Sequence, residues 1–292
     1  MDKKINLNLT WYSIKKNGIL FIFILLCIFL SIITPGFLSS ANILNILRQS
    51  SIIGVMAIGT TFVIIGAGFD ISVGSLLALS AAMCVGLQHY MHWSFAILLV
   101  LIVGALVGLL NGFLAAKIHI PAIIATLGTM TIVRGLVYLY TGGYPLYVEA
   151  PDFAFIGNGY LGPIPFPVVI LVIMVAFWQF ILVRTRFGRY ACALGGNKEA
   201  VRLSGVKVDY YHMLTFVAGG LMASMAGVIY AARLLSVTPL AGQGYELDAI
   251  AATVIGGTSV SGGEGSVVRT LVGVLLLNII ANVFNLLGIH IY

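Results

Sequence analysis

Long apolar stretches, each of a length that can cross a lipid bilayer, follow one another through almost the whole chain. Hydrophobic residues make up 60% of the 292 residues, charged residues make up only 8%, and the mean hydropathy is +1.09. A soluble domain of this size carries charge on roughly a quarter of its residues. These polar groups are too few to cover a water-facing surface, so the chain is predicted to be an all-α polytopic membrane protein.

A spanning helix needs about 20 predominantly apolar residues. By this criterion the sequence predicts a bundle of nine transmembrane helices, at residues 18–34, 50–68, 71–89, 93–116, 120–141, 165–183, 210–233, 246–262 and 266–288. The span 246–262 is short and broken by glycine, so a re-entrant or partly unwound segment is the alternative there. No soluble domain separates the spans, and residues 1–292 are expected to form a single transmembrane domain.

The positions of the basic residues predict the orientation of the chain. With the N-terminus in the cytoplasm, most Lys and Arg residues fall in cytoplasmic segments, the longest of which is 184–209. Only Arg48 and Arg233 then fall outside, and Arg134 lies within a span. An excess of basic residues marks the cytoplasmic side of a membrane protein. The net charge of +6 is therefore attributed to topology and not to nucleic-acid binding, and Tyr292 is expected outside.

The segment 184–209 carries the signals of a short helix. Asn197 is a good N-cap, Glu199 suits the first turn, and Gly205 suits the position after the C-cap. A helix of about two turns is unstable alone in water. We therefore expect it either to dock on a partner protein or to pack on the bundle.

Asp70 lies at a junction between two spans, followed by Ser72 and Ser75. A carboxylate at membrane depth is costly unless it is paired or hydrated. Asp70 is expected to cap the free N–H groups at the start of the next helix, or to line or gate a passage, and the two roles are compatible.

Polar residues in other spans are candidates for the same passage. Asn278, Asn282 and Asn285 recur at i, i+4 and i+7 on one helix face, where interhelical hydrogen bonding is an equal alternative. Thr126 and Thr129 lie in the span 120–141.

Arg134 lies further along that span, where it is expected to line an outer vestibule, to reach the interface, or to form an ion pair. We favour pairing with Glu246 or Asp248, which open a helix on the outer side.

Small residues repeat every four positions on several spans, which predicts close helix crossings. The stripes are Gly104, Gly108 and Gly112; Gly74, Ala78, Ala82 and Gly86; and Gly219, Ala223 and Gly227. Residues 65–75 and 255–263 are also loosely alike, which an internal repeat and a coincidence of composition explain equally well.

Three motifs occur together and in order. They are Gly-x-Asp-Ile-Ser-Val-Gly-Ser at 68–75, Gly-Gly-Asn-x-x-Ala-x-x-x-Ser-Gly at 195–205, and Gly-Tyr-Glu-Leu-Asp-Ala-Ile-Ala-Ala at 244–252, with Ile-Gly-Gly-Thr-Ser at 255–259. In this combination the chain resembles the permeases of bacterial ABC-type monosaccharide importers, and the ribose transport permeases most closely.

The resemblance implies a permease homodimer in the bacterial inner membrane, with a cytoplasmic ABC ATPase and a periplasmic or lipid-anchored sugar-binding protein as partners. It implies that 197–205 is the coupling helix that docks on the ATPase. The residues assigned to this coupling are Gly195, Gly196, Asn197, Glu199, Ala200, Arg202, Leu203, Ser204 and Gly205. It also implies ten helices per subunit, so the last helix is expected to be missing from this chain.

Two other classes of function are alternatives. A secondary sugar carrier or channel needs coupling-ion carboxylates at mid-membrane, for which Asp70 is the candidate. A membrane enzyme is disfavoured because the sequence has no HExxH motif, nucleophile elbow or pair of intramembrane aspartates. We expect no catalytic residue, cofactor or metal site, and we expect ATP hydrolysis to reside in a partner.

Overall fold

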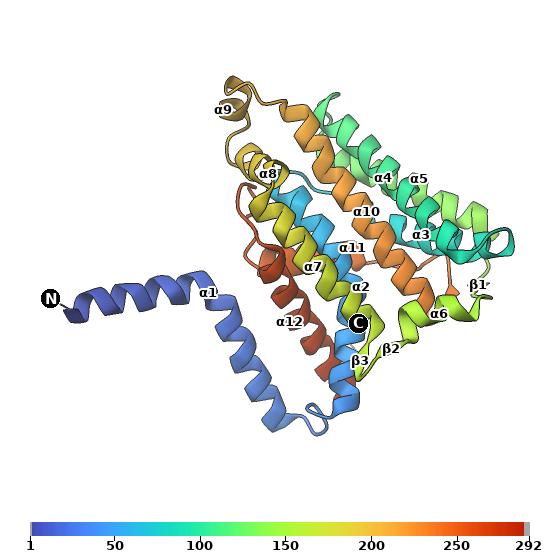
Figure 1. The fold of residues 1–292 in the computed structure, drawn as a ribbon, viewed down its shortest axis with the longest axis horizontal. Helices are drawn as coiled ribbons and strands as arrows, with labels where there is room; N and C mark the ends of the chain where they lie inside the picture. The colour runs from blue at the N-terminus through green and yellow to red at the C-terminus, as the bar shows by residue number, and fades with distance from the viewer. Residues whose placement is uncertain (1, 289–292) are drawn as a thin grey trace.

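The computed structural model describes residues 2–288, and it describes side chains from Gly18 onward, so the expected place of Tyr292 lies outside the described residues. Helices build almost all of it (Figure 1). In chain order they are α1 (Asp2–Ile33), α2 (Ser40–Ile65), α3 (Val73–Gly86), α4 (Trp93–Ala116), α5 (Ala122–Thr141), α6 (Pro151–Asn158), α7 (Phe166–Arg184), α8 (Arg186–Gly196), α9 (Lys198–Leu203), α10 (Val208–Leu234), α11 (Tyr245–Ile255) and α12 (Val267–Leu286), with a 3-10 turn, η1 (Leu87–His89), after α3.

Two short antiparallel strand pairs complete the fold. β1 (Leu146–Tyr147) pairs with β4 (Ser236–Val237), and β2 (Tyr160–Leu161) pairs with β3 (Ile164–Pro165). Together with α6 they occupy one end of the bundle, whereas α9 projects beyond the other end (Figure 1). We call these the α6 end and the α9 end.

The structure confirms the predicted all-α polytopic fold. Within the described residues, six helices are long and apolar enough to cross a membrane: α2, α4, α5, α7, α10 and α12. The apolar part of α1, Gly18–Ile33, is shorter. It packs mainly on α12, while the preceding part of α1 points away from the bundle (Figure 1).

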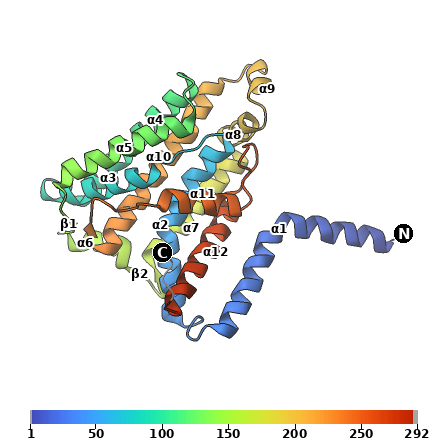
Figure 2. The ribbon, with the colours of Figure 1, turned by 180° about the vertical axis from the view of Figure 1, so that it is seen from behind.

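The two remaining predicted spans, 71–89 and 246–262, are not full-length helices. α3 continues through η1 as one apolar helix, Val73–His89, which is still shorter than a full span, and α11 has 11 residues and is about 16 Å long, whereas the hydrocarbon core is about 30 Å thick. Both views place α11 in the middle of the bundle, between α12 and α3 (Figure 1, Figure 2). After Ile255 the chain continues as a loop with left-handed glycines, so the partly unwound alternative is the correct one there.

The start of the second span was predicted too late. α2 begins at Ser40 and not near residue 50, because the Ser39 side chain accepts a hydrogen bond from the backbone N–H of Asn42 and starts the helix. The ten added residues include the polar pair Arg48–Gln49, which the hydropathy criterion treats as a boundary.

The predicted close crossings form around α10. At Gly112 a Cβ atom would lie 2.7 Å from Cα of Met213, and at Gly104 it would lie 2.6 Å from the carbonyl oxygen of Gly220. The backbones of α4 and α10 therefore touch without side chains between them. In lipid, where burial of apolar surface gives little gain, such close contact is the main attraction between helices.

The first prediction concerns this crossing. Gly108→Ala places a methyl group against the carbonyl of Phe216 and 3.0 Å from Cα of Val217, and we expect a loss of roughly 1–3 kcal/mol in the free energy of unfolding. Gly135→Ala on α5 is the matched control, because nothing lies within 4 Å of its Cβ position. Unfolding in mixed detergent micelles measures both, and equal stabilities would contradict the proposed crossing.

Candidate functional site

The two interrupted segments predicted to resemble each other lie in contact near the α9 end. The N–H of Gly263 donates to the carbonyl of Ile65 at 2.9 Å. The C-terminus of α8 closes on the same point, where a Cβ at Gly195 would overlap both the Ile65 carbonyl and the Gly263 nitrogen. Three segments distant in sequence thus meet backbone to backbone, and Gly195 belongs to this junction.

Asp70 is buried just before α3, with only 2% of its surface exposed. Its Oδ1 accepts from the backbone N–H of Ser72 at 2.9 Å and from the Ser72 hydroxyl at 2.6 Å. Asn111 of α4 donates to Oδ2 at 3.3 Å. Asp70 thus makes the expected capping contact. Sequence analysis missed Asn111, although it is the one amide in the otherwise apolar span 93–116.

Thr126 of α5 holds the same chain break from the other side. Its hydroxyl accepts from the N–H of Ile71 at 3.3 Å and donates to the carbonyl of Ala122 in its own helix at 2.9 Å, with the carbonyl of Phe69 also 3.3 Å away. The hydroxyls of Ser75 and Thr129 bond to carbonyls one turn earlier in the chain. These predicted passage residues are buried in this conformation, with their polar groups engaged inside the fold.

Arg134 is half-buried, at the thirteenth position of the 20-residue α5. Its Nη1 donates to the carbonyls of Pro239 at 2.7 Å and Ala241 at 2.8 Å. The favoured ion pair with Glu246 or Asp248 is wrong, because no such pair forms among the described residues. The chain segment before α11 instead enters the bundle and offers its carbonyls to the guanidinium.

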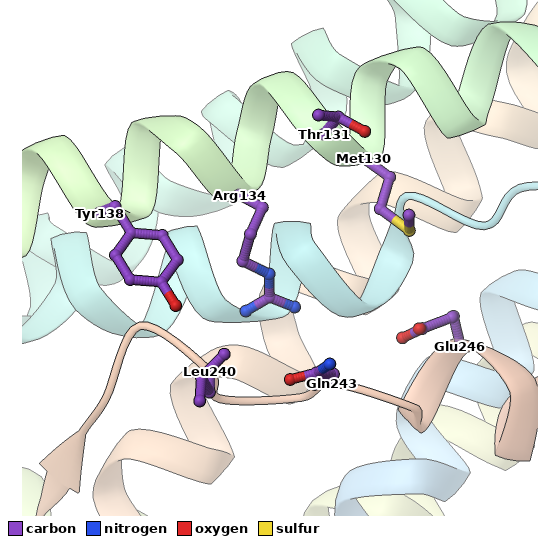
Figure 3. A pocket seen from close by; sticks show the side chains of 7 residues that line it. All are labelled: Met130, Thr131, Arg134, Tyr138, Leu240, Gln243 and Glu246. Atoms are coloured by element: carbon purple, nitrogen blue, oxygen red, sulfur yellow. The ribbon is translucent and has the colours of Figure 1, made fainter. Parts of the chain in front are cut away.

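Around Arg134 lies a cavity of about 290 Å³. We call it the Arg134 cavity; its walls are Met130, Thr131, Arg134, Tyr138, Leu240, Gln243 and Glu246. Arg134 and Tyr138 point from α5 toward the segment that carries Leu240 and Gln243, and Glu246 points into the same space from the start of α11 (Figure 3).

Glu246 sits where two short helices begin. Its Oε1 accepts from the N–H of Gly244 at 3.2 Å, and its Oε2 is buried without a hydrogen-bond partner. Oε2 touches the Cβ position of Gly74, in the first turn of α3. The positive ends of the α3 and α11 dipoles thus converge on one carboxylate, which only a residue without a side chain at position 74 permits.

A second cavity, of about 330 Å³, lies between α2, α11 and α12. It brings together the predicted residues Asp248, Asn278 and Asn285 with Gln49, which sequence analysis missed. Asn282 does not join them. Its side chain exchanges two hydrogen bonds with that of Asn42, at 2.8 and 3.0 Å, which is the interhelical alternative.

The predicted short helix is present as α9. The Asn197 side chain accepts from the N–H of Ala200 at 2.9 Å. Beyond the helix, Gly205 has φ +77° and the N–H of Val206 bonds to the carbonyl of Val201, which is the Schellman ending. Gly195 and Gly196 do not precede it as a loop, because they form the last residues of α8.

No residue of α9 is buried in the chain. Leu203, at its C-terminal end, is 81% exposed, and Glu199 and Arg202 form an ion pair at 3.2 Å on its surface. Packing on the bundle is therefore not what covers this helix in the described chain.

Comparison with known proteins identifies the family to which this chain is similar. The family described as branched-chain amino acid transport system / permease component matches residues 42–291. The ribose import permease protein RbsC of Haemophilus influenzae is 43% identical, over 98% of this chain and 90% of that protein. RbsC of Bacillus subtilis is 43% identical over 94% and 86%. The D-allose transport system permease protein AlsC of Escherichia coli is 36% identical over 99% and 89%. No solved structure was found to match.

The second prediction tests the hydrogen bonds that close the break before α3. Thr126→Val leaves the N–H of Ile71 without its acceptor, and we expect a loss of about 1–3 kcal/mol in the free energy of unfolding. Thr131→Val on the same helix is the control, because the Thr131 hydroxyl is exposed and bonds only within its own turn. A similar loss in both variants would contradict the role assigned to Thr126.

Proposed function

This chain belongs to the family of branched-chain amino acid transport system permease components, and on that premise we propose that it is the membrane-spanning subunit of an ATP-driven monosaccharide importer. The relatives named as ribose and D-allose permeases, 36–43% identical over nearly the whole chain, favour ribose or a closely related sugar as its cargo. It provides the passage through the inner membrane, and a partner ATPase provides the energy.

The observation that carries the coupling role is the exposure of α9. A six-residue helix with no buried residue gains little from the bundle, and its caps are local hydrogen bonds at its own ends. Leu203 presents an apolar side chain outward, which suits a groove on a partner protein. We assign α9, together with Gly195 and Gly196 before it, to contact with the cytoplasmic ATPase.

The junction at Gly195 offers a mechanical link from α9 to the passage. When ATP closes the ATPase pair, a displacement of α9 is carried by α8 to the bond between Ile65 and Gly263. Those residues end α2 and follow α11, so the two short helices α3 and α11 are repositioned. The polar residues at their starts then face alternately outward and inward.

The family supports proposals for the remaining parts of the assembly. A second copy of the chain completes the passage, and a periplasmic or lipid-anchored sugar-binding protein delivers the cargo at the α6 end. The N-terminus and the α9 end face the cytoplasm, in keeping with the basic residues of 184–209. The candidate passage residues are those of the two cavities, with Asp70, Asn111 and Thr126 controlling the position of α3.

The third prediction tests the docking role of α9. Leu203→Asp should leave membrane insertion and the fold unchanged, but reduce retention of the ATPase at least about tenfold, since loss of a central apolar contact costs about 2 kcal/mol. Co-purification of the tagged permease with its ATPase measures this, and uptake of labelled ribose should fall in parallel. Leu161→Asp is the control at the α6 end, where Leu161 is 61% exposed. Normal ATPase retention by Leu203→Asp would refute the assignment.

The fourth prediction tests the orientation. In a variant with Cys27, Cys84 and Cys192 replaced, Lys198→Cys in α9 should react with a membrane-impermeant maleimide only after the cells are opened. Leu161→Cys in β2 should react in intact cells. The reverse pattern would place α9 outside and end the ATPase-driven mechanism.

A further inference from the structure

We propose that the Arg134 cavity is a binding site for a neutral monosaccharide within the permease itself, where the Glu246 carboxylate accepts hydrogen bonds from sugar hydroxyls. The site is a station that the sugar occupies during transit, in addition to any site on a binding protein. This inference rests on the proposed function and identifies the side chains that handle the cargo.

The cavity holds polar groups that the described chain leaves available. Glu246 Oε2 is buried without a hydrogen-bond partner, and only Nη1 of Arg134 is engaged by the described hydrogen bonds. Gln243 adds an amide, and Tyr138 adds a hydroxyl. An unsatisfied buried acceptor costs about 1–3 kcal/mol, which a ligand hydroxyl donating to Oε2 recovers. Donors and acceptors facing one space suit a polyol, because each sugar hydroxyl both donates and accepts.

The setting surrounds the carboxylate with positive groups without an ion pair. Glu246 lies at the positive ends of both α3 and α11, accepts from the N–H of Gly244, and shares its cavity with Arg134. A direct Arg–Glu ion pair would use up both groups. Instead Arg134 is held by the carbonyls of Pro239 and Ala241, so Oε2 has no hydrogen-bond partner within the described chain.

The position of the cavity is that of a cargo site. Arg134 lies about two thirds of the way along α5, and the starts of two helices too short to span meet at Glu246. Helices that begin inside the membrane commonly surround the substrate of a transporter. The volume of about 290 Å³ lies just below the ~300–1,000 Å³ range of small-molecule pockets, which suits a ligand smaller than a typical drug.

A branched-chain amino acid is the other occupant to consider, since its carboxylate and ammonium groups match Arg134 and Glu246. The composition of the wall favours the sugar. The apolar side chains Met130 and Leu240 share the wall with Thr131, Tyr138 and Gln243, so a fully apolar ligand tail would cover polar groups.

The test is direct binding to the full-length permease in lipid nanodiscs, by equilibrium dialysis with labelled D-ribose and, separately, labelled L-leucine. We expect ribose to bind weakly and leucine not to bind. Glu246→Gln should weaken ribose binding at least tenfold, because a neutral amide replaces a charged acceptor. Gly74→Ala, which pushes a methyl group against Oε2, should weaken it similarly. Asp152→Asn, in α6, is the matched carboxylate control and should bind as the wild type does.

Unchanged ribose binding in both cavity variants, or leucine binding in place of ribose, overturns the inference. A thermal unfolding curve for each variant separates lost binding from lost fold, and Arg134→Lys provides a third variant in the same cavity.

Uptake of labelled ribose in cells with all partners distinguishes a failure of the cavity assignment from a failure of the proposed function. If the wild type imports no sugar, the function is wrong. If it imports ribose and the cavity variants import equally well, only the cavity assignment is wrong.

Discussion

Every backbone N–H and carbonyl group inside a membrane must find a partner within the protein, and this constraint governs the whole arrangement. Within the bundle the chain is twice non-helical, before α3 and after α11. Asp70 and Thr126 supply the backbone partners at the first break, Asn111 holds the Asp70 carboxylate in place, and the bond between Ile65 and Gly263 ties this break to the second. Polar side chains that look costly in lipid are therefore what makes the interrupted helices possible.

Interrupted helices, in turn, allow function at membrane depth. A continuous helix exposes only side chains along its length, whereas α3 and α11 also expose their first N–H groups in the interior of the bundle. Glu246 lies at that meeting point because Gly74 leaves room for it. The same absence of a side chain at Gly195 allows α8 to reach the breaks, so the surface helix α9 and the polar interior share one connected backbone framework.

The sequence predicted helix ends and helix crossings correctly where they depend on neighbouring residues. Asn197 and Gly205 delimit α9 because capping depends on a few neighbouring residues, and Gly112 marks a crossing because its stripe is periodic. Pairings across the sequence were missed, as with Asn111 and Asp70, which are 41 residues apart. Arg134 was assigned to a carboxylate because side-chain charges are visible in a sequence, while the carbonyls of a segment that folds inward are not. The apolar composition of these segments likewise could not reveal that α3 and α11 are shorter than a membrane span.

The paired amides of Asn42 and Asn282 have a consequence for how the bundle can move. They join the beginning of α2 to the last turns of α12, far from α9, through two reciprocal hydrogen bonds. Sliding of one helix along the other would break both bonds at once, whereas a small change of angle would break neither. The two helices are thus held together at one end, and this contact can act as a pivot. Any separation between the helices then increases with distance from the two asparagines.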